Sequence, residues 1–196
     1  MKKVLLTVLA IIIFSACSKD VMPTATPEPV LEEVFEQVVD DGKTLSSQDF
    51  FDAGLKEYKE YNVAKLIGAT EAWYGYWGKN MDDFQTVNYY ELRFYPDHST
   101  AVSDGTLFAE DATGKDANLG RKDAMWRVGL ADRKRNRPSS GINLGREWRL
   151  SKYAEYMIYD NVIMLCEGED SREAFKLCTD LTGIVNSNFK SELDSD

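Results

Sequence analysis

The sequence predicts an α+β domain that is mainly β, built as an antiparallel meander or a small barrel and preceded by one or two amphipathic helices. Apolar and aromatic residues alternate along several short segments after residue 68, which is typical of strands. Between residues 30 and 67 apolar residues recur at helical spacing instead. The hydrophobic fraction of 43% in 196 residues is enough for one core, and the charged fraction of 29% is ordinary for a globular domain.

The N-terminus has the pattern of a signal peptide. Lys2 and Lys3 precede an apolar run over residues 4–14, whose polar member is Thr7. A bilayer-spanning helix needs about 20 residues, so this run is too short to be a permanent membrane anchor. We expect residues 1–16 to be removed.

The stretch Phe14-Ser15-Ala16-Cys17 resembles the lipobox of bacterial lipoproteins. This resemblance implies that Cys17 carries a diacylglyceryl thioether and an N-acyl chain, which together would make attachment to a membrane effectively permanent. Because Ser18 stands where an inner-membrane retention signal would have Asp, the resemblance implies a lipid anchor in the outer membrane. The domain would then face either the periplasm or the cell surface.

Between the lipidation site and the β domain we expect a tether and a helical preface. Residues 17–29 hold three of the five prolines and form the tether. Residues 30–67 form the preface, with one helix over 30–40 and a second that is capped at Ser46 and ends near Leu66. The two helices either cover the domain's own core, as amphipathic helices usually do, or present a face to a partner.

The β domain is expected over residues 68–187, followed by an acidic tail over 188–196. Strands are predicted around residues 73–77, over 88–95 and through 148–166, with a turn or bulge at Asp160 and Asn161. A turn at 96–99 should lead to a short return strand over 100–102, and a turn at 167–172 to a strand over 174–179.

Little in the sequence favours catalysis. His98 is the one histidine and is expected in the turn after the second strand, so a histidine-dependent triad lacks its parts. One histidine and three cysteines are also too few for most metal sites. Gly-rich phosphate loops are missing as well. We expect neither an enzyme nor a cofactor.

The aromatic cluster over 73–77 and the segment over 91–102 resemble the opening of bacterial lipocalin-like lipoprotein domains. The resemblance implies an up-and-down sheet whose interior can enclose a small apolar ligand. Such a barrel can equally be filled by its own side chains. The aromatic residues that would line a cavity or fill a core are Trp73, Tyr90, Trp126 and Trp148.

Two further cysteines are placed to pair. Cys166 and Cys178 lie symmetrically about Arg172, the centre of the predicted turn, and would face each other across a hairpin. Because a signal peptide directs the chain to an oxidising compartment, we expect a disulfide, with two buried thiols as the alternative.

Basic residues concentrate in one part of an acidic chain whose net charge is -10. Residues 121–149 hold nine Lys or Arg and three Asp or Glu, which gives +6. The mature chain, 17–196, has 21 basic and 33 acidic residues, or -12, so the remainder carries -18. The exposed loop with Arg133, Arg135 and Arg137, flanked by Trp126 and Trp148, either binds an anionic ligand such as a glycolipid headgroup or pairs with the protein's own acids.

These observations together predict a membrane-anchored cell-envelope lipoprotein that is a non-enzymatic, lipocalin-like binding or structural module. Its ligand would be a small apolar or anionic molecule. The alternative is a protein-interaction or inhibitor module that acts on another envelope protein. Nucleic acid is a poor partner for a tethered chain of net negative charge.

Overall fold

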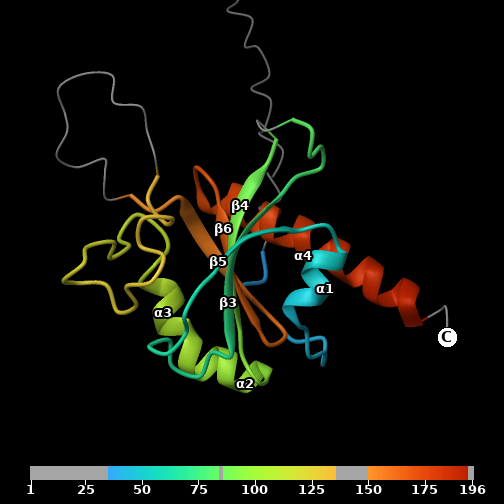
Figure 1. Cartoon of the computed structure of the whole chain (residues 1–196), viewed down its shortest axis with the longest axis horizontal. Helices are drawn as coiled ribbons and strands as arrows, with labels where there is room; N and C mark the ends of the chain where they lie inside the picture. Colours follow the sequence, from blue (N-terminus) through green and yellow to red (C-terminus); the bar gives the residue numbers. More distant parts are fainter. Residues whose placement is uncertain (1–34, 84–85, 136–149, 194–196) are drawn as a thin grey trace, which may run out of the picture. The chain divides into compact units, whose positions relative to one another are not determined.

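A computed structural model describes residues 35–83, 86–135 and 150–193, which form one six-stranded sheet with helices on both faces (Figure 1). The strands are β1 Val38–Val39, β2 Lys56–Glu60, β3 Glu71–Trp77, β4 Asn88–Phe94, β5 Tyr153–Tyr159 and β6 Val162–Glu167. Their order is β1-β5-β6-β4-β3-β2, and every pair is antiparallel except β1 with β5.

The α+β, mainly β class is therefore confirmed, and of the two predicted architectures, an antiparallel meander or a small barrel, the barrel is wrong. Strands β1 and β2 form the two edges of an open sheet. Each edge is unsuited to further pairing, since β1 has two residues and β2 is exposed throughout and rich in Lys and Glu. The sheet thus encloses no interior of the lipocalin kind.

One face of the sheet is covered by α1 Ser47–Asp52 and α4 Ser171–Leu193. Because side chains alternate along a strand, Tyr90, Leu92 and Phe94 of β4 all point to this face and join its core. Helix α1 contributes the fully buried Phe50, which packs edge-on against Phe94. Helix α1 begins directly after Ser46, as predicted for the second preface helix, and it covers the domain's own core.

Apart from the start of α1, residues 35–67 differ from the predicted helical preface. Ser46 N donates to Asp49 Oδ2 at 2.6 Å, as expected for a capped N-terminus, but the helix ends at Asp52 instead of Leu66. Gly54, at φ +98, turns the chain into edge strand β2. In the described part of the expected first helix, residues 35–40, the chain instead forms β1 beside β5.

The other face carries α2 His98–Thr100, the π-helical η1 Ala101–Gly105 and α3 Thr106–Glu110, which follow one another directly. The predicted return strand over 100–102 is wrong because Asp97 Oδ1 accepts a hydrogen bond from Thr100 N at 2.7 Å and so caps a helix. His98 consequently lies in a helix, with its Nδ1 2.7 Å from the carbonyl oxygen of Asp160. Residues 111–135 then extend over the same face.

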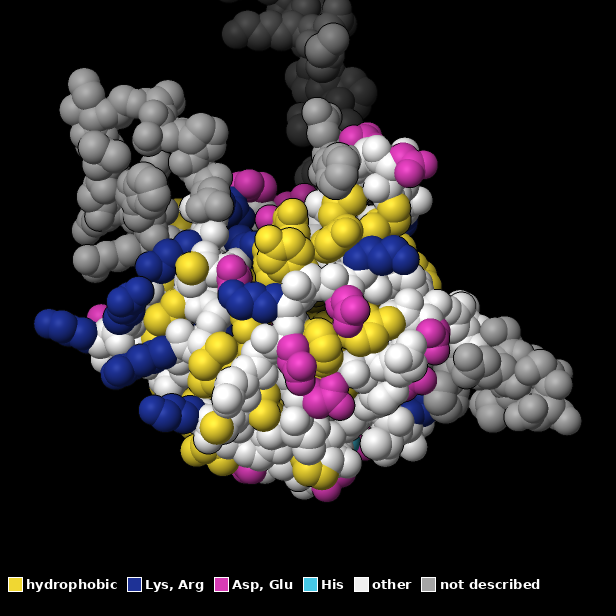
Figure 2. All heavy atoms as spheres, in the orientation of Figure 1, with side chains coloured by type: hydrophobic (Ala, Val, Ile, Leu, Met, Phe, Trp, Pro, Cys, Tyr) yellow, Lys and Arg dark blue, Asp and Glu magenta, His cyan; other side chains and the backbone are white. Residues whose placement is uncertain are grey.

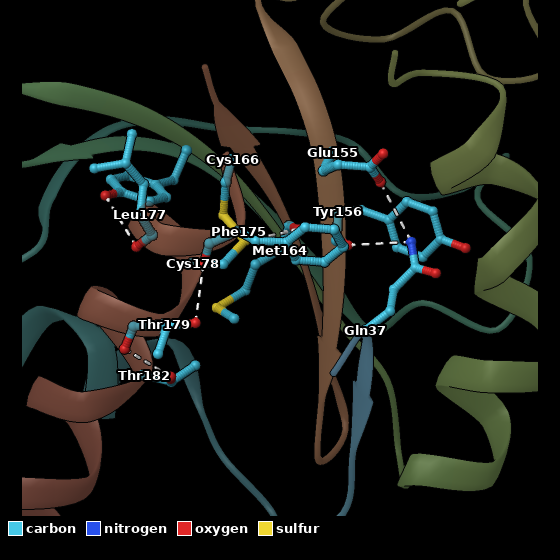
Figure 3. The surroundings of a disulfide bond; sticks show 11 residues. Gln37, Glu155, Tyr156, Met164, Cys166, Phe175, Leu177, Cys178, Thr179 and Thr182 are labelled. Atoms are coloured by element: carbon cyan, nitrogen blue, oxygen red, sulfur yellow. Dashed lines mark hydrogen bonds between the residues drawn. A yellow bond between two sulfur atoms is a disulfide. The ribbon is translucent and has the colours of Figure 1, made fainter. Parts of the chain in front are cut away.

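The predicted strand over 174–179 is also wrong, because these residues belong to the long helix α4. Its buried residues are spaced as on one helical face: Ala174, Cys178, Leu181 and Val185. The predicted disulfide is present, but it joins strand β6 to helix α4 and does not cross a hairpin (Figure 3). The Cα atoms of Cys166 and Cys178 are 5.7 Å apart.

The predicted turn between β5 and β6 is confirmed, and it fixes the chain before α1. Asp160 adopts φ +50 there. The Asn161 amide is buried and donates from Nδ2 to the carbonyl oxygens of Leu45 and Tyr95, both at 2.9 Å. Its Oδ1 accepts from Leu45 N at 2.6 Å. Across the three described ranges no helix combines the length and the apolar character that a bilayer crossing requires.

Candidate functional site

A cluster of buried charges lies on the sheet face that α3 covers. Glu91 and Arg93 alternate along β4 and are 0% exposed, and Arg133 reaches them from the segment after α3. Glu91 Oε1 lies 2.7 Å from Arg93 Nη2, and Glu91 Oε2 accepts from Arg133 Nε at 2.7 Å. The Trp126 ring centroid is 5.2 Å from the Arg93 guanidinium carbon and 4.6 Å from that of Arg133. One carboxylate and one aromatic ring thus hold two arginines.

The electrostatics of this cluster favour the ionised form of Glu91. Burial alone would raise the pKa of the Glu91 carboxyl, but the charges and hydrogen bonds of Arg133 and Arg93 outweigh burial and lower this pKa. Arg133 Nη1 also donates to the carbonyl oxygen of Trp126 at 3.1 Å. The cluster therefore fixes residues 126–133 to the sheet.

Asp132 provides a second attachment of the same segment. Its carboxylate accepts from Lys59 Nζ at 2.9 Å and from the Tyr61 hydroxyl at 2.8 Å. Burial opposes ionisation of Asp132, but the bonds from Lys59 and Tyr61 lower its pKa overall. Gly129, at φ +77, allows the backbone to pass close to the Tyr61 ring, where a Cβ would lie 2.8 Å from Cζ.

The segment is attached a third time at Arg135. Its Nη1 pairs with Glu169 Oε2 at 2.6 Å, and its Nη2 donates to the carbonyl oxygen of Gly168 just before α4. Arg135 therefore joins the segment to the loop between β6 and α4.

Between these attachments lies a basic groove of about 600 Å³. Its lining includes five cations and one carboxylate: Lys59, Arg121, Arg127, Lys134, Arg135 and Asp132. Lys59 and Arg135 have the partners named above. Within the described ranges Arg121, Arg127 and Lys134 have no carboxylate partner. Figure 2 shows Lys and Arg side chains gathered on the side where Figure 1 places α3 and the segment after it.

Another buried cation, Lys152, lies among tyrosines. Its Nζ donates to the Tyr74 hydroxyl at 2.7 Å and lies 4.7 Å from the ring centroids of both Tyr74 and Tyr89. Burial lowers the pKa of the Lys152 ammonium, and the nearby Glu167 partly opposes this effect. Lys152 thus stabilises the tyrosine cluster and does not line the groove.

The structure does not bring the predicted ligand-binding residues together. Tyr90 is buried on the α4 face, where half-buried Trp73 also packs, whereas Trp126 is buried on the opposite face. Arg133 pairs with Glu91, and Arg135 with Glu169. The other predicted residues, Arg137, Trp148 and the lipidation site Cys17, lie outside the described residues.

Sequence reasoning singled out neither the buried carboxylate nor most of the groove. Glu91 and Arg93 carried a signal, since two charges inside an otherwise apolar strand indicate a buried pair. Arg121 and Arg127 contributed to the charge of the basic segment, but their position beside Lys59 depends on the tertiary fold. In the described part of the chain, His, Cys, Asp and Glu form no group able to hold a metal.

The fold and the site define a small α+β domain with an open, mainly antiparallel sheet and a basic groove held by a buried ion cluster. Residues 46–187 match the family described as Family of unknown function (DUF6810). Since this match covers more than half of the 196 residues, the chain belongs to that family. No curated protein and no solved structure matches the chain significantly.

Proposed function

We propose that the protein is a non-enzymatic cell-envelope lipoprotein, anchored through Cys17, whose domain binds an anionic ligand in the basic groove. One observation carries the binding role: Arg121, Arg127 and Lys134 line a groove without a carboxylate partner among the described residues. The chain as a whole has 33 acidic residues, so acids to neutralise these cations are abundant. A groove whose described lining is nevertheless mainly cationic is suited to phosphate or carboxylate groups.

An anionic ligand is better supported than the apolar one that the lipocalin resemblance implied. An open sheet provides no barrel interior. Tyr90 and Trp126 fill cores on opposite faces of the sheet and so cannot line one cavity. The guanidinium groups that face the groove offer planar, multiple donors for oxyanions.

Isothermal titration calorimetry with tripolyphosphate tests the binding role. We expect the single variants Arg121→Gln and Arg127→Gln each to weaken binding about tenfold, because each removes a charge-assisted contact. Arg172→Gln is the matched control, since Arg172 is exposed on α4, which packs on the opposite face of the sheet. Binding that is absent in the wild-type protein, or equally strong in all variants, would contradict the proposal.

The anchor is tested separately by feeding cells labelled palmitate. The support for it is the lipobox-like sequence that ends at Cys17. We expect label on the wild-type chain and none on Cys17→Ser, with the wild-type chain alone entering the detergent phase of a phase-partition assay. An unlabelled wild-type chain would remove the anchor and leave the binding role to be judged by titration.

A further inference from the structure

Large apolar side chains are exposed on the same side of the domain as the cations. Ile67 is 64% exposed, Leu107 61% and Met125 50%. We call these three residues the apolar patch. They come from the loop after β2, from α3 and from the segment after α3. Exposed apolar side chains that gather in one place mark an interaction surface more often than isolated ones do.

Hydrogen bonds and close approaches place Ile67 and Met125 near the two ends of the short helical run that carries Leu107. Met125 N donates to Asp111 Oδ2 at 2.9 Å, and Asp111 lies one helical turn after Leu107. On the other side of Leu107, Asp104 lies one turn earlier, and a Cβ added at Gly68 would be 2.7 Å from its Oδ2. Ile67 directly precedes that glycine.

A groove of about 730 Å³ includes Met125 of the patch in its lining. The lining also includes the buried Trp126 and two cations, Lys65 and Arg127. Arg127 also lines the basic groove, so the two grooves meet at this residue.

Four cations lie close in sequence to Ile67 and Met125, whereas Leu107 is flanked on its helical run by Asp104 and Asp111. Lys65, Arg121, Lys122 and Arg127 are all exposed and have no carboxylate partner within the described ranges. Residues 121–135 hold six basic and two acidic residues, a net +4, in a chain of -10. Figure 2 shows hydrophobic side chains interleaved with Lys and Arg over this side of the molecule.

We infer that this face docks on the surface of an anionic phospholipid bilayer, whose headgroup phosphates are the anionic groups that enter the basic groove. The inference rests on the proposed function and names the source of its ligand. A soluble anion would engage the cations alone, whereas a bilayer interface engages cations and exposed apolar side chains at once. The negative charge of the rest of the chain is repelled by such a surface, so this face approaches it preferentially.

The stretch of chain between Cys17 and β1 allows this orientation. Residues 18–35 can span at most about 60 Å when fully extended, which exceeds the diameter of a small domain of about 30 Å. An anchor at Cys17 would therefore hold the domain at high local concentration beside the bilayer without dictating which face meets it. Docking would then depend on the residues of the face itself.

Vesicle flotation tests the inference on the mature chain, 17–196, with Cys17→Ser so that acyl chains do not contribute. Vesicles of phosphatidylcholine alone are compared with vesicles that contain about 40% phosphatidylglycerol, at about 0.1 M and about 0.5 M salt. We expect binding to the anionic vesicles at low salt and its loss at high salt. Each basic residue near an anionic surface changes partitioning about fivefold, so Arg121→Gln with Arg127→Gln should reduce vesicle binding about 25-fold.

A second pair of variants tests the apolar contribution. Ile67→Ser with Met125→Ser keeps every charge, and we expect it to reduce vesicle binding several-fold while leaving tripolyphosphate binding unchanged. Arg172→Gln, on α4, should retain vesicle binding. Circular dichroism checks that each variant is folded.

Three outcomes would overturn the inference. If tripolyphosphate binds but anionic vesicles do not, the ligand is a soluble anion and the proposed function stands without docking. Equal binding to neutral vesicles would show that the phosphates play no part. Unchanged vesicle binding by the Ile67→Ser, Met125→Ser variant would show that the apolar patch does not touch the bilayer.

Discussion

Replacement of Glu91 by Gln tests whether the buried ion cluster holds the domain together. The Glu91 carboxylate lies 2.7 Å from nitrogen atoms of both Arg93 and Arg133, and all three side chains are at most 2% exposed. Gln has nearly the same volume and keeps an acceptor, so the substitution removes the negative charge with little change in packing. Two guanidinium groups then remain buried without a counter-ion.

Removing one partner of a buried ion pair lowers the free energy of unfolding by about 3–5 kcal/mol, because the remaining charge stays desolvated. Since domains of this size are stable by about 5–15 kcal/mol, the loss would be a large share of the total. We expect urea unfolding at pH 7 to show a free energy of unfolding about 4 kcal/mol lower for Glu91→Gln. Glu57→Gln is the control, since Glu57 is exposed on β2, and it should change this free energy by less than about 0.5 kcal/mol.

The pH dependence gives the same prediction an independent check. The folded state lowers the pKa of Glu91, so its contribution is complete above the unfolded-state pKa of about 4.3 and is lost as the pH falls through the folded-state pKa. The difference in unfolding free energy between the wild type and Glu91→Gln should therefore shrink below about pH 4. A loss under about 1 kcal/mol at pH 7, or a difference that stays constant into acid, would refute the reasoning.

Two further predictions concern the disulfide and the glycines Gly129 and Gly183. Replacing Cys166 and Cys178 by Ser should lower the free energy of unfolding by about 3 kcal/mol, as expected for a disulfide that closes a short loop. Reductant should have the same effect on the wild-type protein. An unchanged urea midpoint would contradict this prediction. Gly129→Ala should lower the free energy of unfolding by about 2–4 kcal/mol, because φ is +77 and the added Cβ would meet the Tyr61 ring. Gly183→Ala should raise this free energy by about 0.5–1 kcal/mol, because Gly183 is exposed within helix α4. Equal midpoints in thermal melts would contradict both.

Strands β3 to β6 were predictable because apolar and aromatic residues dominate them, whereas β1 and β2 lie where helices were predicted. Tyr90, Leu92 and Phe94 share one face of β4, and this alternation is visible in the sequence without knowledge of the neighbours. The turn at Asp160 and Asn161 was also visible, since short polar side chains favour such positions. The open sheet was not predictable from these strands, because closure depends on whether the edges meet.

Two helical segments were predicted as strands because each predicted segment is short. Residues 100–102 and 174–179 are too few to distinguish a period of 2.0 from one of 3.6. Over a longer stretch the spacing of Ala174, Cys178 and Leu181 is helical, and the capping residue Asp97 marks the start of the helical run at His98.

The net positive charge of the basic segment was visible in the sequence, but the sequence did not show which of its arginines are exposed. Arg133 was predicted to belong to an exposed loop, yet it is buried because it pairs with Glu91, 42 residues away. The pairing buries the Arg133 guanidinium and holds residues 126–133 against the sheet. Arg121 and Arg127 remain exposed on the side of this segment that faces away from the sheet. The buried cluster and the basic groove are therefore two sides of one segment. The net charge of the segment predicted a site for anions, but the pairing with Glu91 of β4 determines which of its arginines remain exposed.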